Sequence, residues 1–528
     1  MNVHDKPDMA AGGAGKNKFL KTGADFKRSL QDGRVVFYQG ERIEDVTTHF
    51  ATAGGIEQIA EIYDDQFGGA GQGKLTYTRD DGQLVTTSYM VPHTREDLAK
   101  RREGIKYVAR KTWGTHCRGI DMISCFPVGM IGYLPTFRKH CPELVNNIIN
   151  YRKYAEESNI YLSETIVDPQ GFRGRSGGTT PDTMPPQRAV ARIVKESSKG
   201  VWISGLKGVG TVAPQCNEIL VGSFHPPAPD ESFWTYIPAN APGVRMFCRE
   251  VVHRPGSSTY DHPIAAKGEE AEAMVVFDEV FVPRERLMSL RSPELASVNF
   301  FNKWAAYSHW YTFVRSVAKA ELYAGLAQVI IEVLELEHIP LVRQRVSEII
   351  QFAQILQGMC LASEVEAKMS EGDVLIPEGS VITAGRIFAM ENLPWVLHLL
   401  RDLCGQGLIL RFTEKDLSEK AAFGQQFSWF LDTQHVTANE KNLLMNLVWD
   451  VAASEHSTRS MIFEEQNALN APLLRERMFG EYDRAETSKF VRDYINLPPA
   501  PPKVNRAPVL NQQTSLGGGG HRAFAGGN

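Results

Sequence analysis

Two side chains of this sequence have types and surroundings that suit ligand chemistry. Arg118 precedes an apolar run that begins at Ile123, and an arginine there needs an anionic partner because an unpaired buried charge is costly. That partner is either a bound anion or Asp121 of the chain itself. His309 lies in the aromatic segment Trp304–Tyr311, where a single histidine is either packed in the core or placed to act on a ligand. These residues are candidates for anion recognition and proton chemistry.

Two further segments could contact a cofactor. In Asp168–Arg173, Gln170 and Arg173 offer hydrogen-bond donors, and Gln170 also offers an acceptor. Gly205–Thr211 follows a strand-like run, and its glycines would let a planar or anionic ligand approach the backbone, with Thr211 adding a hydroxyl. Because a glycine-rich turn between strands is commoner than a ligand loop, neither segment identifies a cofactor alone.

Two common kinds of site are not indicated. Gly68–Lys74 is similar to a phosphate-binding loop, but Leu75 stands where Ser or Thr would hold magnesium, and no strand pattern precedes it. The cysteines and histidines lack the clustered spacing of metal ligands, and His116 and Cys117 are adjacent, which disfavours a shared tetrahedral site. We therefore expect a flexible turn at the first segment and no structural metal.

Three zones of the chain must position these residues. Residues 18–164 are mostly helical in pattern, with Thr94 as the N-cap of one helix. Residues 165–290 hold short β-branched and aromatic runs, with a hairpin turn at 198–200. Residues 291–497 are helical again. The predicted strands are Ala189–Val194, Val201–Ile203, Glu218–Val221, Phe233–Ile237, Val244–Cys248 and Ala273–Val282. The predicted long helices of the third zone are Val317–Glu337, Val342–Ser370, Val381–Leu403 and Asn439–Asn467.

Composition narrows the class of protein. The 528 residues are 43% hydrophobic and 23% charged, which is ordinary for a soluble globular protein, with disorder expected at residues 1–17 and a flexible tail at 498–528. The net charge is −5 without a dominant basic block, so we expect no nucleic-acid partner. The 7 cysteines include no CxxC pair, which favours reduced thiols in the cytoplasm. No secretory signal is expected, and the longest apolar run, Ile123–Phe137, is too short and broken to cross a membrane.

In their order along the chain, these motifs resemble one known family. The matching pieces are Val167–Gln170 with Arg173, Gly205–Thr211, Val276–Pro283, His309 with Arg315, Lys319–Leu322, and Arg459 with Phe463 and Glu464. The resemblance spans about residues 23–498. The sequence resembles the oxygenase component of two-component flavin-dependent aromatic hydroxylases, the 4-hydroxyphenylacetate 3-monooxygenase family, which includes chlorophenol and nitrophenol monooxygenases.

The resemblance implies a fold and a reaction. The implied fold is α+β and acyl-CoA-dehydrogenase-like, with an N-terminal helical domain, a central β-barrel-like domain and a C-terminal four-helix bundle, assembled as a homotetramer. The implied cofactor is reduced FAD, which a separate NAD(P)H-dependent flavin reductase supplies, so no GxGxxG dinucleotide motif is needed. Reduced FAD and O2 would form a flavin C4a-hydroperoxide that hydroxylates an electron-rich aromatic substrate.

The resemblance also implies roles for single residues. Gln170, Arg173, Thr211 and Arg459 would contact the flavin, and Gly405 would lie near the cofactor and a subunit contact. Arg118 would bind the phenolate oxygen of the substrate, and His309 would stand at the reactive flavin edge, hydrogen-bonding the peroxide or moving the phenol proton. An aromatic residue would line the site at Phe224.

Three positions depart from the family pattern. Met122 stands where hydroxyphenylacetate hydroxylases have Tyr, and Glu164 stands where they have His. Met461 stands where chlorophenol-type enzymes have Phe. These residues would shape substrate choice, so the resemblance predicts the fold and the flavin chemistry better than it predicts the substrate.

Two other functions remain open at the level of sequence. One is an FAD and iron–sulfur enzyme similar to 4-hydroxybutyryl-CoA dehydratase, although Cys117 and Cys125 are too far apart to copy its cysteine pair and Ser316 lies where a further cysteine is expected. The other is a non-catalytic oligomeric binding protein that has lost the flavin chemistry. The presence of Gln170 and His309 argues against it.

Overall fold

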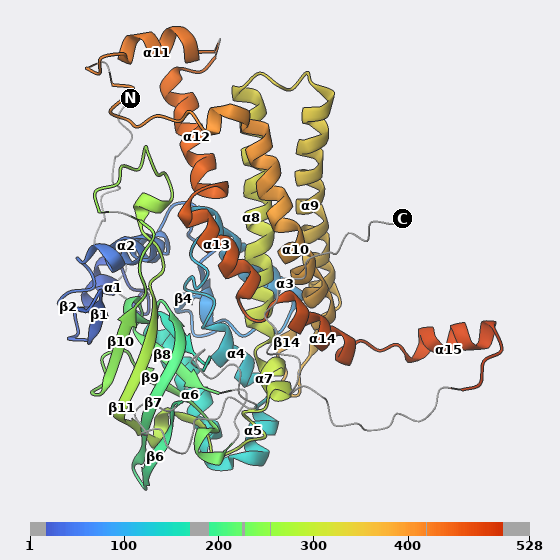
Figure 1. Ribbon diagram of the computed structural model, residues 1–528. Coiled ribbons are helices and arrows are strands. Elements are labelled where there is room, and N and C mark those ends of the chain that lie inside the picture. The colour runs from blue at the N-terminus through green and yellow to red at the C-terminus, as the bar shows by residue number, and fades with distance from the viewer. Residues whose placement is uncertain are drawn as a thin grey trace, which may run out of the picture.

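The computed structural model describes residues 17–168, 190–223, 228–253, 255–418, 420–433 and 435–499. A 10-stranded sheet lies at one end of the molecule, and long C-terminal helices stand beside it and extend away from it (Figure 1). This combination of helices with a large sheet confirms the expected mixed α and β content. The predicted disordered start and flexible tail lie almost entirely outside the described residues.

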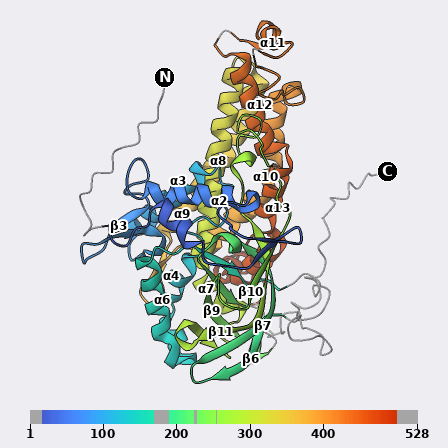
Figure 2. The same ribbon diagram turned by 90° about the vertical axis from the view of Figure 1, so that its left-hand side faces the viewer.

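The first part of the chain is helical, as expected. Its helices are α1 (Gly23–Ser29), α2 (Phe50–Asp65), α3 (Arg95–Lys111), α4 (Cys125–Ile131), α5 (Leu134–His140) and α6 (Val145–Glu157). Thr94 caps α3 as predicted, because its hydroxyl accepts the N–H of Asp97 at 3.1 Å while the Asp97 carboxylate accepts the N–H of Thr94 at 3.0 Å. This reciprocal pair satisfies two donors at the helix start. Helix α6 lies against the large sheet, and α4 packs on α6 (Figure 2).

The large sheet has the strand order β12-β9-β8-β5-β7-β11-β10-β1-β2, with β6 beside β7. Its strands are β1 (Val36–Tyr38), β2 (Glu41–Ile43), β5 (Leu162–Thr165), β6 (Arg192–Ser197), β7 (Gly200–Thr211), β8 (Glu218–Gly222), β9 (Phe233–Pro238), β10 (Val244–Cys248), β11 (Glu272–Pro283) and β12 (Leu287–Leu290). Two small hairpins pair β3 (Thr76–Thr78) with β4 (Leu84–Thr86) and β13 (Lys368–Met369) with β14 (Leu375–Ile376). The predicted hairpin turn at 198–200 joins β6 to β7. Strands β1 and β2 and most of β5 come from before residue 165, and the division into three domains stays a prediction.

The glycine-rich segment differs from its prediction. Gly205–Thr211 was expected as a loop after a strand, but it forms the second half of β7. The N–H of Gly208 donates to the carbonyl of Val167 at 2.6 Å, and Lys207 pairs with Asp168 at 2.7 Å. A Cβ on Gly208 would lie tight against that carbonyl, so the missing side chain lets the 167–168 segment approach the strand. The described residues 167–168 therefore lie beside the second half of β7.

The C-terminal part is helical, and its long helices pack on one another beside the sheet, whereas the last helix stands apart from them (Figure 1). They are α7 (Val298–Trp304), α8 (Ala306–Val333), α9 (Pro340–Val365), α10 (Gly379–Cys404), α11 (Gly424–Leu431), α12 (Ala438–Ala452), α13 (Glu455–Gln466), α14 (Ala471–Glu481) and α15 (Ala485–Tyr494). The prediction of one helix over 439–467 is wrong, because Ser454 begins a new helix by accepting the N–H of Ser457. No helix among the described residues is long and apolar enough to cross a bilayer.

Aromatic side chains join the sheet to the helices. Trp234 of β9 stacks on Phe301 of α7 with ring centroids 5.4 Å apart, and it meets Trp304 edge-on at 4.9 Å. Gly129 of α4 lies against the carbonyl of Trp304, where a Cβ would overlap the oxygen. This packing fixes the segment before α4 and the first turn of α8, which carry the two chemical candidates from the sequence.

Candidate functional site

Arg118 is buried and pairs with Glu164, which the sequence singled out only as a position that departs from the family pattern. Its Nη2 and Nε lie 2.7 and 2.8 Å from Oε1 of Glu164, and its Nη1 donates to Oδ1 of Asn467 at 2.8 Å. The alternative pairing with Asp121 is wrong, because Asp121 instead accepts a hydrogen bond from Ser88 at 2.6 Å. The predicted arginine site is thus an ion pair inside the protein.

The backbone of Arg118 is also held. The hydroxyl of Tyr161 donates to the Arg118 carbonyl at 2.7 Å, and the Arg118 N–H donates to the Glu270 carboxylate. The guanidinium lies over the Phe463 ring, 5.3 Å from its centroid. Burial lowers the pKa of Arg118 and Glu164 raises it, with a net upward shift, while burial raises the pKa of Glu164 against the opposing effect of Arg118. Arg118 therefore stays charged in a dry site.

His309 lies in the first turn of α8 with one ring nitrogen engaged. Its Nδ1 is 2.9 Å from Nη1 of Arg386, and a guanidinium can only donate, so Nδ1 is the acceptor and the proton sits on Nε2. Burial, with Arg477 and Arg386 nearby, lowers the pKa of His309 well below its usual value. Burial lowers the pKa of Arg386 to about 9, so Arg386 is still charged at neutral pH. His309 is therefore a neutral N–H donor, and its Nε2 has no hydrogen-bond partner within the described ranges.

Asn467 connects the arginine and the histidine. Its side-chain oxygen accepts the bond from Arg118, while its backbone carbonyl accepts one from Nη2 of Arg386 at 2.8 Å. Nη2 also donates to the carbonyl of Ala468 at 2.8 Å. The sequence did not point to Asn467 or Arg386. The only available signal was an arginine on the apolar face of the predicted helix 381–403.

A row of three residues across the sheet relates Arg118 to Arg459. Thr211 on β7 is the direct cross-strand partner of Glu164 on β5 and of Glu272 on β11. Directly paired residues of antiparallel strands point to the same face of the sheet. Glu164 binds Arg118 and Glu272 binds Arg459, so Thr211 lies between the acids that hold the two arginines. Three residues that the resemblance assigned to one site are thus brought together.

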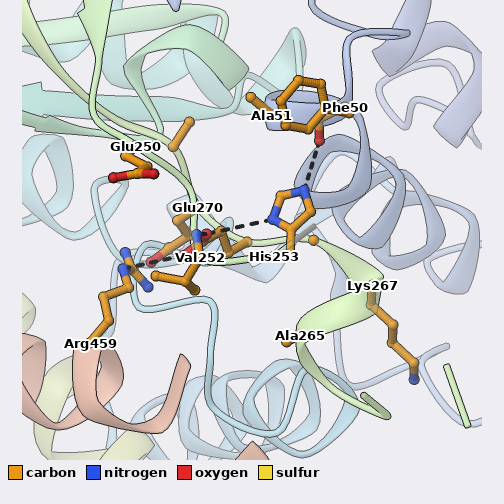
Figure 3. A network of polar contacts seen from close by, with 12 residues as sticks. Phe50, Ala51, Glu250, Val252, His253, Ala265, Lys267, Glu270 and Arg459 are labelled. Carbon is orange, nitrogen blue, oxygen red and sulfur yellow. Dashed lines mark hydrogen bonds and ion pairs between the residues drawn. The ribbon is translucent and has the colours of Figure 1, made fainter. Parts of the chain in front are cut away.

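Arg459 lies on α13 and pairs with the acidic segment 269–272. Besides Glu272, it approaches Glu269 at 3.4 Å. In Figure 3, Arg459 and His253 approach this segment from opposite sides, and His253 also contacts the carbonyl of Phe50 at 2.8 Å. Arg459 also lines an open cavity of about 450 Å³ formed between the end of α12 and α13. The other residues around it are Ala453, Ser454, Glu455, Thr458 and Ile462.

The remaining predicted site residues lie outside the described ranges or make none of the contacts above. Gln170, Arg173 and Phe224 lie outside the described residues. Met122 is buried in the core four residues after Arg118, and Met461 is half-buried on α13. Gly405 follows α10 with φ of +54°, a conformation that glycine adopts without strain.

Comparison with known proteins gives a consistent set of relatives. The chain is 27% identical to the oxygenase component of 4-nitrophenol 4-monooxygenase/4-nitrocatechol 2-monooxygenase from Rhodococcus opacus, over 86% of this chain and 87% of that protein. It is 27% identical to 2,4,6-trichlorophenol monooxygenase from Cupriavidus pinatubonensis, over 89% of this chain and 90% of that protein. It is 26% identical to the oxygenase component of 4-hydroxyphenylacetate 3-monooxygenase from Thermus thermophilus, over 90% and 97%.

Solved structures agree. The oxygenase component of 4-hydroxyphenylacetate 3-monooxygenase, complexed with FAD and 4-hydroxyphenylacetate, superposes with a TM-score of 0.83 at 25% identity, over 90% of this chain and 98% of that one. An archaeal 4-hydroxybutyryl-CoA dehydratase from N. maritimus has a TM-score of 0.82 at 16% identity, over 92% and 97%, which shows a shared fold. Residues 22–289 match the N-terminal part, and residues 297–496 the C-terminal part, of the family described as 4-hydroxyphenylacetate 3-hydroxylase. The resemblance drawn from the motifs is thereby confirmed, and the chain belongs to the 4-hydroxyphenylacetate 3-hydroxylase family.

Proposed function

We propose that this chain is the oxygenase component of a two-component monooxygenase that hydroxylates a phenolic or other electron-rich aromatic compound. Its cofactor is reduced FAD, supplied by a separate NAD(P)H-dependent flavin reductase, and its second substrate is O2. The observation that carries the proposal is the buried cluster in which Asn467 joins Arg118 to the Arg386–His309 pair. That cluster occurs in a chain whose relatives are named as oxygenases of nitrophenols, chlorophenols and 4-hydroxyphenylacetate.

The described residues fit a flavin beside this cluster. Nε2 of His309 is a buried donor without a partner among them, and Arg459 borders a cavity of about 450 Å³. In this proposal Thr211 and Arg459 contact the flavin, together with Gln170 and Arg173, and Gly405 lies near it. When bound, reduced FAD supplies the activation of O2.

The protein's own contribution is charge, orientation and exclusion of water. Arg118 holds the ring oxygen of the substrate beside a positive charge that is already desolvated, so little reorganisation is needed during the reaction. His309 offers its fixed N–H at the reacting end of the flavin. Met122, Met461 and Phe224 surround the aromatic ring in this proposal.

We also propose that the enzyme is a cytoplasmic homotetramer, in which the sheet is barrel-like and α8, α9, α10 and α12 form a four-helix bundle. Large apolar side chains at the far end of the helices support an assembly. Trp429 and Phe430 of α11 are 75% and 80% exposed, which is unusual for a surface that contacts only water.

An iron–sulfur enzyme has less support. The shared fold with 4-hydroxybutyryl-CoA dehydratase occurs at 16% identity. In the described ranges no three His, Cys, Asp or Glu side chains are placed to hold a metal.

The proposal is tested by mixing the purified protein with reduced FAD, O2 and a panel of phenols. Hydroxylated product and hydrogen peroxide are then measured separately. We expect at least one phenol to give product in excess of peroxide. Peroxide alone across the whole panel, with reduced FAD bound, would count against the proposal.

A further inference from the structure

Glu164 carries a buried oxygen that the fold leaves unused. Both bonds from the Arg118 guanidinium reach Oε1, whereas Oε2 is buried and has no partner in the described part of the chain. The backbone of Glu164 is held on both sides, by Leu220 of β8 and Thr211 of β7, and the two bonds from Arg118 to Oε1 hold the carboxylate itself in place. A buried acceptor without a donor is costly unless a ligand supplies one.

We propose that Glu164 accepts the proton of the substrate's ring hydroxyl at Oε2, so that this enzyme takes phenols in their neutral form. This inference rests on the proposed function and deepens it. The O–H bond of the phenol breaks, its proton moves to Oε2, and its electron pair stays on the ring oxygen beside Arg118. After the ring is oxidised, the same proton returns to the product oxygen, so the carboxylate is restored.

Charge supports a neutral ligand. The Arg118–Glu164 pair sums to zero, so a neutral phenol enters without adding charge to a dry site. A phenolate would instead place a second negative group beside Glu164, and like charges within a few ångströms oppose each other strongly. An isolated arginine would have the opposite preference.

Neighbouring groups are less suited to accept this proton. Nδ1 of His309 is occupied by Arg386 and Nε2 already carries its proton. Glu270 also has a buried Oε2 without a partner in the described part of the chain, but its Oε1 binds the backbone N–H of Arg118. Burial raises the pKa of Glu270 to about 7, so it is protonated over much of the acidic range, and the variant Glu270→Gln distinguishes the two acids. The charged and titratable groups packed around Glu164, directly or through these contacts, are Arg118, Glu270, Glu272, Arg459, Arg386 and His309.

The test uses 4-nitrophenol and the full-length protein without flavin. Only the anion of 4-nitrophenol is yellow, so its absorbance reports the ionisation of the bound ligand. We expect wild type to raise the apparent pKa of the bound phenol by about one unit, and Glu164→Gln to lower it by about one unit, because Arg118 then lacks its anion. Glu218→Gln is the matched control, since Glu218 is a buried acid on the adjacent strand with partners on both oxygens.

A reaction measurement complements the binding test. For a phenol that is neutral in the assay, Glu164→Gln should lower kcat/KM about a hundredfold and shift the acidic limb to the phenol's own ionisation. For a phenol that is already ionised, the loss should be no more than about twofold, because no proton needs to move. The control variant Glu218→Gln should keep the wild-type profile.

Three results would overturn the proposal. Glu164→Gln could keep the wild-type direction of the 4-nitrophenol shift, or Glu270→Gln could reverse it instead. If Glu164→Gln does not fold, the pH profile of kcat/KM of the wild-type enzyme decides the question. An acidic limb that follows the ionisation of each phenol contradicts the proposal. An acidic limb at the same pH for all phenols supports it. Absence of product from every phenol, with the ligand shifts as expected, would refute the proposed oxygenase function and leave the role of Glu164 in binding intact.

Discussion

Arg386 donates a hydrogen bond to Nδ1 of His309 across 2.9 Å, and both side chains are buried. Because a guanidinium has no acceptor, this contact leaves the histidine with one tautomer, in which Nε2 carries the hydrogen. The carbonyls of Asn467 and Ala468 hold the other end of Arg386. The direction of the His309 donor is therefore set by a residue on another helix.

Replacing Arg386 should change the orientation of the His309 ring while the histidine itself is kept. Arg386→Lys keeps a positive charge but cannot bond His309 and both carbonyls in the same planar arrangement. We expect the ratio of product to peroxide to fall about tenfold, with the affinity for reduced FAD nearly unchanged. Arg401→Lys on the same helix, which removes a contact to the Ala452 carbonyl, is the control and should leave the ratio as in wild type.

His309 itself should control coupling. His309→Ala removes a preorganised donor, and we expect product formation to fall about a hundredfold while peroxide release continues. Because the pKa of His309 lies well below its usual value, its contribution in wild type should not change between mildly acidic and mildly basic pH. The exposed His398→Ala is the control. Unchanged coupling in His309→Ala would remove this residue from the mechanism.

Arg118 should matter more for the substrate than for the flavin. Arg118→Ala leaves the buried Glu164 unpaired, so a stability loss of about 3–5 kcal/mol is expected beside the catalytic effect. Arg118→Lys preserves the charge and separates the two effects. We expect both variants to raise KM for phenols while the Kd of reduced FAD changes little, as measured by flavin titration. Equal losses in substrate and flavin binding would contradict the assignment.

Arg459 should bind the flavin, and the structure offers a matched control. Arg249 pairs with the same acids as Arg459, at 2.7 Å from Glu269, so either arginine can be removed without leaving these acids wholly unpaired. Arg459→Met should weaken binding of reduced FAD about tenfold, because an ionic contact is lost. Arg249→Met should not. Equal effects of the two variants would indicate that both arginines serve only the acidic segment.

Acid should destabilise the fold through a second buried cluster. Glu464 accepts from Arg315 at 2.6 Å and from Lys319 at 2.8 Å. Burial would raise the pKa of Glu464, but these two cations hold it at about 2, below the 4.5 of a free side chain. The folded-state pKa is depressed, so this stabilisation is complete above pH 4.5 and is lost as the pH falls towards about 2. The shift corresponds to roughly 3 kcal/mol.

His116 acts in the same direction. Burial lowers the pKa of His116 from 6.5 to about 3. Between these two values the unfolded chain binds more protons than the folded one, so the stability decreases as the pH is lowered. Urea unfolding midpoints across this range check the account. We expect Glu464→Gln to be less stable than wild type at neutral pH and to lose the part of the acid sensitivity that lies below pH 4.5. A variant with the full acid dependence of wild type would contradict this assignment.

The parts of the fold that sequence predicts are those set by local pattern. The cap at Thr94 and the strands near Glu218 and Val244 follow from residue type and spacing, and the structure confirms them. The break at Ser454 was missed because α12 and α13 are continuous in apolar pattern, and a single serine caps the second helix. Local patterns do not distinguish a capping serine from one inside a helix.

The sequence predicts the main residues of the site but not the hydrogen bonds that connect them. Arg118 and His309 were identified from their surroundings and from the resemblance. The partner of Arg118 was not, because Glu164 reaches it through the register of β5 in the sheet, and no spacing along the chain encodes that contact. Asn467 and Arg386 join the cluster through the end of α13 and the inner face of α10, where sequence shows only an ordinary helix end and a charge in an apolar stripe.

The central claim is that this chain transfers an oxygen atom from O2 to an aromatic ring by using reduced FAD. The most direct measurement supplies the purified protein with reduced FAD, a phenol that gives product, and isotopically labelled O2, followed by mass spectrometry of the product. We predict that the new hydroxyl carries the label from O2 and that omission of reduced FAD abolishes product. A product whose new oxygen comes from water, or labelled peroxide without any labelled product from the whole panel, would contradict the account.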